Sequence, residues 1–126
     1  MELSEYFEKT QGRGVLATAD EKGKVNVAVY SRPHFINEKT LAFIMADRLT
    51  HKNILGNPAA AYLFMEDGTG YSGKRLYLKW IGEGKDSSLI EKLRRRKYYQ
   101  GKEAGGSRYL VYFRVEKVLP LIGDKK

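Results

Sequence analysis

Short strand-like segments, each bounded by turn-forming residues, follow one another along most of this 126-residue chain. The first two, "GVLATA" (14–19) and "VNVAVYS" (25–31), flank the turn-rich "DEKGK" and predict a β-hairpin. Further segments of this type lie at 41–46, 59–65, 74–84 and 108–121. Strands with such short connections pair antiparallel, and a small sheet loses its exposed edges by closing into a barrel. The sequence therefore predicts a mainly β fold, a six-stranded antiparallel β-barrel with short helices, as one domain over residues 1–126.

The second and third of these segments differ in which faces are apolar. Val25, Val27 and Val29 alternate with Asn26, Ala28 and Tyr30, so segment 25–31 places its valines on one face. The segment "LAFIMA" (41–46) predicts a strand whose two faces are both apolar. Between the two, Pro33 argues against continuation as a central strand, and "NEKT" predicts a turn.

Sequence signals for a helix occur at three places in the chain. Ser4 is a good N-cap for a helix over "EYFEKTQ", with Gly12 beyond its end. Thr50 is a good N-cap for "HKNILGN", which Gly56 and Asn57 end and Pro58 stops. The segment 86–100 has caps and an apolar spacing that predict a third helix.

The absence of cysteine excludes several classes of site. Disulfides, thiolate zinc sites, iron–sulfur clusters and cysteine nucleophiles are ruled out, and the composition suits a reducing cytoplasm. The two histidines are too few for a histidine metal site. The longest apolar runs are far shorter than the ~20 residues of a membrane helix, and the amino terminus lacks a signal-peptide pattern. We therefore expect a soluble cytoplasmic protein with no membrane contact.

The net charge of +8 is concentrated toward the carboxyl terminus. Residues 1–73 hold 8 Lys and Arg against 9 Asp and Glu, whereas residues 74–126 hold 15 against 6. Such an excess indicates an anionic partner, or else a solvated basic surface. The run "LRRRKYYQGK" (93–102) joins cations to aromatic rings as in single-strand binders, but consecutive arginines spread around a helix. We favour a cationic collar that attracts an anionic substrate or a phosphorylated nicotinamide cofactor, with nucleic-acid binding as the weaker alternative.

The tetrad Thr50-His51-Lys52-Asn53 opens the second of the expected helices. The first amides of a helix have no partner inside it and point outward with the positive end of the dipole. A hydroxyl and an ammonium beside them predict a site for a phosphate monoester. An ordinary cap with Lys52 in solvent is the alternative interpretation.

No other motif predicts catalysis by the chain itself. The Gly-rich "GTGYSG" precedes a strand rather than a helix, so it lacks the context of a dinucleotide or P-loop motif. No Ser-His-Asp order is visible. Any chemistry is therefore expected to belong to a cofactor.

Taken together, the segments resemble the FMN-binding split-barrel family related to pyridoxamine 5'-phosphate oxidase. The resemblance covers about residues 5–123 and is carried by "GVLATADEKGKVNVAVYS", "LAFIMADRLTHKNILGNPAAAYLF" and "GSRYLVYFRVEKVLPLIG". The middle stretch is similar to the family pattern of a strand, a hydroxyl-x-Lys turn, and Asn-Pro before the next strand. "EDGTGYSGKRLYLKW" is similar to the Gly-rich turn and strand of small flavin-binding members. The barrel that this resemblance implies is of the split type.

In that family the cofactor is FMN, and two subunits pair with a flavin at each end of their interface, so the resemblance implies a homodimer. The phosphate binds the hydroxyl-x-Lys turn, and the isoalloxazine ring lies along the second strand and the end of the third. The residues that the resemblance assigns to this site are Val29, Tyr30, Ser31, Met45, Ala46, Asp47, Thr50, His51, Lys52 and Asn53. We expect a cation near the pyrimidine edge of the ring, Arg48 or Lys79, to favour the reduced anionic flavin.

The resemblance implies an oxidoreductase or electron-transfer flavoprotein, and it assigns no catalytic residue and no metal. Pyridoxamine 5'-phosphate oxidase continues past the barrel into a segment whose arginines help hold its substrate. This sequence ends at "PLIGDKK", so we expect a different substrate. The same fold could instead hold deazaflavin F420 or haem, or it could store a flavin without turnover.

Overall fold

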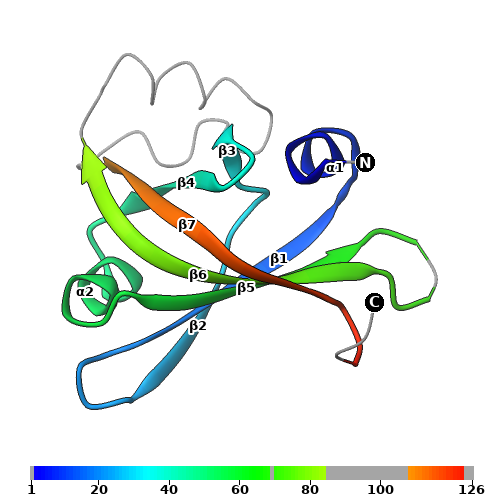
Figure 1. The fold of residues 1–126 in the computed structure, drawn as a ribbon. Helices are drawn as coiled ribbons and strands as arrows, with labels where there is room; N and C mark the ends of the chain where they lie inside the picture. The colour runs from blue at the N-terminus through cyan, green and yellow to red at the C-terminus, as the bar shows by residue number, and fades with distance from the viewer. Residues whose placement is uncertain (1, 69, 85–107, 124–126) are drawn as a thin grey trace.

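The computed structural model describes residues 2–68, 70–84 and 108–123, and in them one seven-stranded sheet is flanked by two short helices (Figure 1). The elements in chain order are α1 (Leu3–Lys9), β1 (Gly12–Ala19), β2 (Val25–Val29), β3 (His34–Asn37), β4 (Thr40–Ala46), α2 (Leu49–Gly56), β5 (Ala59–Glu66), β6 (Gly73–Gly84) and β7 (Arg108–Pro120). The two helices lie at opposite ends of the sheet (Figure 1). Neither of these described helices is long and apolar enough to cross a membrane.

The sheet is antiparallel throughout, with the strand order β2-β1-β5-β6-β7-β4-β3. It curls so far that residues from the two ends of this order meet. The ring of Tyr30, just after β2, lies edge-on to Phe43 of β4, with the ring centroids 5.5 Å apart. Side chains, rather than a backbone ladder, therefore join these two ends of the barrel within the described residues.

The core fills the inside of the curled sheet. It is built from aliphatic and aromatic side chains on the inner faces of the strands, and each helix adds one buried apolar side chain, Phe7 from α1 and Ile54 from α2. The strand residues that are fully or almost fully buried are Leu16, Leu41, Phe43, Met45, Tyr62, Phe64, Leu76, Leu78, Val111 and Phe113. The helices thus cover the barrel ends, where a short sheet would leave core side chains exposed.

Two glycines in β1 make room for aromatic rings of the neighbouring strand β5. A β-carbon at Gly14 would lie 1.9 Å from the hydroxyl oxygen of Tyr62, and one at Gly12 would lie 2.5 Å from the Phe64 ring. Neither contact is possible without displacing the ring. The segment "GRG" at 12–14 is therefore required by the packing of the core.

The predicted antiparallel β architecture is confirmed, with seven strands in place of the six expected. The additional strand, β3, begins directly after Pro33 and pairs with β4 through a register shift between Phe35 and Asn37. Because β3 is an edge strand, the proline before it removes no ladder hydrogen bond. The predicted strand at 41–46 with two apolar faces forms as β4, and both faces are buried, since Ala42 and Ile44 form a second buried cluster on the opposite face from the main core.

Both predicted N-caps are wrong. Helix α1 begins at Leu3 with Glu2 as N-cap, and α2 begins at Leu49 with Arg48 as N-cap, in each case without a side-chain cap bond. The hydroxyl and amide of Ser4 instead donate to the carboxylate of Glu38, and these hydrogen bonds lower the pKa of Glu38. The predicted helix at 86–100 and the basic run at 93–102 lie outside the described residues.

Candidate functional site

The turn between β4 and α2 presents an open helix N-terminus. The Lys52 amide donates to the Arg48 carbonyl, 3.0 Å away, and this is the first bond of the helix. The amides of Leu49, Thr50 and His51 precede that bond, so they have no partner inside the helix. Such amides, with the helix dipole behind them, favour an anion at this point.

The four residues of the predicted phosphate turn divide between two sides of α2. Thr50, His51 and Asn53 are buried, whereas Lys52 is exposed. The Asn53 side-chain amide donates to the hydroxyl of Thr18 at 3.1 Å and so ties α2 to β1. The structure therefore places the Lys52 ammonium on the surface of the first helical turn, and it does not bring the Thr50 hydroxyl to the same surface.

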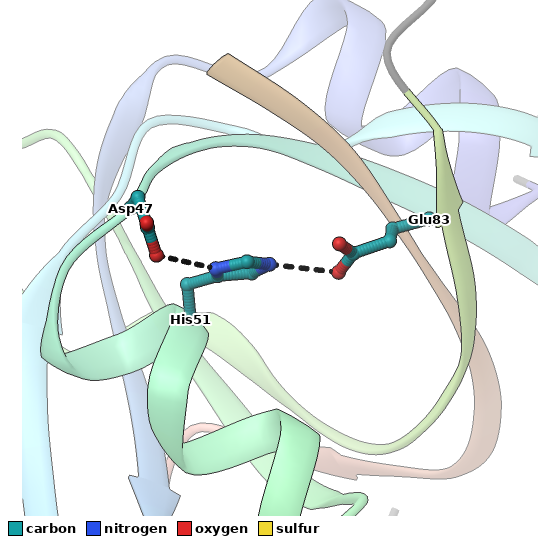
Figure 2. Close-up of polar contacts among 3 residues, drawn as sticks. All are labelled: Asp47, His51 and Glu83. Carbon is teal, nitrogen blue, oxygen red and sulfur yellow. Dashed lines mark hydrogen bonds and ion pairs between the residues drawn. The ribbon is translucent and has the colours of Figure 1, made fainter. Parts of the chain in front are cut away.

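His51 is held between two carboxylates (Figure 2), and its ring also lies against an aromatic ring. Its Nδ1 lies 3.0 Å from Asp47 Oδ1, and its Nε2 lies 2.8 Å from Glu83 Oε1. The imidazole stacks on Tyr109 of β7, with the ring centroids 4.2 Å apart and the planes 18° from parallel. His51 is 3% exposed, whereas the side chain of its partner Asp47 is 67% exposed. Sequence reasoning missed Glu83 and Tyr109, because both are far along the chain and only strand pairing brings them to α2.

The predicted ring-binding segment after β2 has two different faces. Val29 is 82% exposed on the outer face of the sheet, whereas the Tyr30 side chain packs inside against Phe43. The Tyr62 hydroxyl lies 3.1 Å from the carbonyl oxygens of both Tyr30 and Ser31, and it fixes this stretch of backbone by donating to them. Tyr30 is therefore part of the barrel wall.

The predicted contacts at the end of β4 also differ in exposure. Met45 lies in the main core, Ala46 is partly exposed, and the Asp47 side chain is 67% exposed. The structure thus brings Asp47 to His51, and it leaves Ala46 as the small residue at the end of the strand. Of the two cations considered for the flavin, Arg48 lies at the N-terminus of α2, and Lys79 lies on β6 opposite Arg114 of β7.

The outer face of the sheet carries an exposed apolar surface. Val25, Val27 and Val29 are 78%, 66% and 82% exposed, and in the strand register Val27 and Val29 lie beside Ala17 and Val15 of β1. A shallow hollow of about 320 Å³ lies on this face. Its lining residues are Val15, Ala17, Val27, Ala61, Tyr62, Leu63, Arg75 and Tyr77. An apolar surface of this kind on an edge strand is typical of a protein–protein interface.

Comparison with solved structures finds the same fold in other proteins. An FMN-binding protein from Syntrophomonas wolfei matches with a TM-score of 0.75 and 17% identity, over 96% of this chain and 84% of the other. A structure named F420 reductase matches with a TM-score of 0.73 and 19% identity, over 94% of this chain and 97% of the other. A candidate pyridoxamine 5'-phosphate oxidase from Lactobacillus delbrueckii matches with a TM-score of 0.67 and 17% identity, over 94% and 90%.

No protein-family model matches the sequence, and no curated protein matches it. The structural likeness therefore concerns the fold. The chain has the split-barrel fold of FMN-binding and pyridoxamine 5'-phosphate oxidase-like proteins, and this confirms the resemblance on which the sequence prediction of the fold was based.

Proposed function

We propose that this protein is an FMN-binding flavoprotein that works as an oxidoreductase or electron-transfer protein. The observation that carries the proposal is the N-terminus of α2, where three amides without helical partners and the exposed Lys52 ammonium adjoin the end of β4 in a split barrel. This arrangement suits a dianionic phosphate, and the fold is shared with a protein whose name records FMN binding.

The phosphate is assigned to the backbone amides of the first turn of α2 and to Lys52, with Thr50, His51 and Asn53 shaping the turn from its buried side. The hydrogen bond from Asn53 to Thr18 holds the helix in place on β1. The burial of Thr50 makes its amide, rather than its hydroxyl, the group offered to the ligand.

The isoalloxazine ring is assigned to the backbone of residues 29–31 and to residues 45–47. Ala46 leaves room for a flat ring, and the Tyr62 hydroxyl holds the backbone of residues 30–31 in a fixed position. When bound, FMN supplies one- and two-electron transfer, and the chain supplies its orientation and electrostatics. Arg48 or Lys79 is the cation expected beside the pyrimidine edge of the ring.

A homodimer through the outer apolar face is part of this proposal. Val25, Val27 and Val29 stand in solvent on an edge strand, where a second copy of the chain would bury them. Val27→Asp places a charge within this face and is expected to turn a dimer into a monomer without unfolding it. Analytical ultracentrifugation measures the change, and Glu21→Gln in the exposed β1–β2 turn is the control. A wild-type protein that sediments as a monomer contradicts the dimer.

A deazaflavin on the same fold is the second candidate. A structural neighbour is named F420 reductase, and Lys79 and Arg114 lie side by side on the outer face of β6 and β7. Two adjacent cations suit a ligand with a long acidic tail. Binding of F420 in preference to FMN, measured with both ligands in one titration, would favour this candidate.

The proposed function is tested by ligand affinity with and without the phosphate. FMN and riboflavin differ only in that group. Lys52→Ala removes a charge-assisted hydrogen bond of about 1.5–3 kcal/mol, which corresponds to about ten- to a hundred-fold weaker FMN binding. Riboflavin affinity is expected to stay the same, and Lys39→Ala, in the exposed β3–β4 turn, is the matched lysine control.

Two outcomes contradict the assignment. If Lys52→Ala weakens the binding of both ligands equally, the role of the lysine is structural. If the purified protein does not bind added FMN, FMN is ruled out as the cofactor. If FMN binds, steady-state oxidation of NADH or NADPH by the loaded protein then separates an oxidoreductase from a storage protein.

A further inference from the structure

The side chains around His51 form a compact charge cluster, which we define as Asp47, His51, Glu83 and Tyr109. The two carboxylates lie on opposite edges of the imidazole (Figure 2). The Tyr109 ring stacks on one of its faces. The cluster joins four separate parts of the chain, namely the turn after β4, helix α2, the end of β6 and the start of β7. The cluster adjoins the open N-terminus of α2, because the backbone of His51 supplies one of the three amides there.

The two contacts of the ring suit a cationic imidazole between two ionised carboxylates. An ionised carboxylate only accepts hydrogen bonds, so each ring nitrogen must donate, and only the imidazolium cation donates from both nitrogens. The 2.8 Å distance to Glu83 lies in the range of charge-assisted bonds, and the 3.0 Å distance to Asp47 is that of an ordinary hydrogen bond. The face of Tyr109 adds a favourable site for a cation. Within the described ranges, charged side chains close to this point in the chain or in the strand register include Arg48, the N-cap of α2, Lys52 of its first turn, and Arg108, which lies opposite Ala46 in the β4–β7 register.

A carboxylate beside a helix N-terminus competes with an incoming anion. Asp47 immediately precedes the N-cap of α2, and its side chain is 67% exposed, so it is able to turn toward the three amides. Glu83 adds a second negative charge next to the same turn. Without a cation between them, the two carboxylates would repel a dianion at the site where the phosphate is expected.

We propose that His51 is a positioning residue that acts as a cation: it holds Asp47 and Glu83 at the edges of its ring and so keeps the N-terminus of α2 open to a phosphate group. This inference rests on the proposed function, since it concerns the same turn. It differs from the assignment that the family resemblance gives to His51, because the imidazole here contacts two carboxylates and an aromatic ring instead of the cofactor.

The charge of the ring is testable without any ligand. The chain contains only two histidines, His34 and His51, so histidine-selective ¹⁵N labelling gives two imidazole spin systems. At pH 7 we expect the His51 ring to show two N–H correlations, one from each ring nitrogen, and the His51→Gln variant identifies the signals. A His51 ring with a single protonated nitrogen would overturn the proposal.

The effect on the site is tested with FMN and riboflavin as probes. His51→Gln removes the cation and keeps a polar side chain. We expect about tenfold weaker FMN binding, the effect of one uncompensated charge close to the phosphate, with riboflavin binding unchanged. In the double variant His51→Gln/Asp47→Asn, most of the lost FMN affinity is expected to return, because the competing carboxylate is gone. His34→Gln, on β3, is the matched histidine control.

The outcomes separate this inference from the proposed function. Equal loss of FMN and riboflavin affinity in His51→Gln, or no recovery in the double variant, would show that His51 only supports the local fold. If His51→Gln does not fold, Asp47→Asn alone is measured instead, and an FMN affinity below that of the wild type with unchanged riboflavin affinity would overturn the inference. A wild-type protein that binds neither ligand would overturn the proposed function itself.

Discussion

Replacement of Gly14 by alanine tests how tightly the barrel wall is packed around Tyr62. The new β-carbon would lie 1.9 Å from the Tyr62 hydroxyl oxygen and 2.2 Å from the ring carbon that carries it. Tyr62 is fully buried, and its hydroxyl is bonded to the backbone of residues 30–31. The ring must therefore move or the two strands must separate, and in both cases the hydroxyl loses its acceptors.

The size of the effect follows from these two losses. Overpacking of a core costs about 1–3 kcal/mol, and a buried hydrogen bond contributes about 0.5–1.5 kcal/mol. Together they predict a loss of about 2–4 kcal/mol in the free energy of unfolding, or about 8–16 °C in Tm for a chain of this length. Urea denaturation followed by far-UV circular dichroism measures the free energy, and calorimetry measures Tm.

Two further variants show whether the ring is the cause. Gly56→Ala is the matched control, because the nearest atom to a β-carbon there is 3.8 Å away, and its effect is expected within about 0.5 kcal/mol. In a Tyr62→Leu background the Gly14→Ala substitution is expected to cost much less than in the wild type, since the obstructing ring is gone. Wild-type stability for Gly14→Ala, or a cost that is the same in both backgrounds, would refute the reasoning.

Two other predictions concern the attachment of α1. Arg32 is buried, and its Nη1 donates to the carbonyls of Phe7, Glu8 and Thr10 at 2.9–3.2 Å, so Arg32→Met is expected to cost about 1.5–3 kcal/mol and to release α1. Hydrogen exchange should show faster exchange in residues 3–9 than in the strands, and unchanged protection there would contradict the role of Arg32. Burial, together with the Glu66 carboxylate, raises the pKa of Tyr6 above its ordinary value of 10.0. Because the pKa is raised in the folded state, Tyr6 stabilises the protein below pH 10.0, and this contribution is lost as the pH rises further. Tyr6→Phe should therefore flatten the fall in unfolding free energy above pH 10.0. An unchanged alkaline slope would exclude Tyr6 as the source of that fall.

The strands were predictable because their signals are local. The alternation at 25–31 and the doubly apolar run at 41–46 depend only on neighbouring residues, and both segments form strands near the expected bounds. Strand β3 was missed because Pro33 argues only against a central strand, whereas an edge strand accepts a proline at its start. The N-caps were wrong for another reason: Ser4 has a distant carboxylate partner in Glu38, which outweighs its local capping preference.

The candidate site was predictable only in part. Lys52 and the helix start were visible in the sequence, since they belong to one short stretch. The neighbours of His51 were not, because Glu83 and Tyr109 reach it through the pairing of β6 with β7 and of β7 with β4. Nothing in the sequence indicated that the valines of β2 face outward, because periodicity shows that a strand has one apolar face and does not show which side of the sheet that face occupies.

The meeting of Tyr30 with Phe43 joins two ends of the sheet that no ladder connects in the described chain. Separating them there disturbs aromatic contacts and leaves every interstrand backbone hydrogen bond of the seven strands intact. The Tyr30–Phe43 pair contributes about 0.5–1.5 kcal/mol beyond the area that it buries, so side-chain packing instead of a ladder holds the barrel together along this line. The line of the barrel that has no ladder thus lies beside the segment to which a flat ring is assigned.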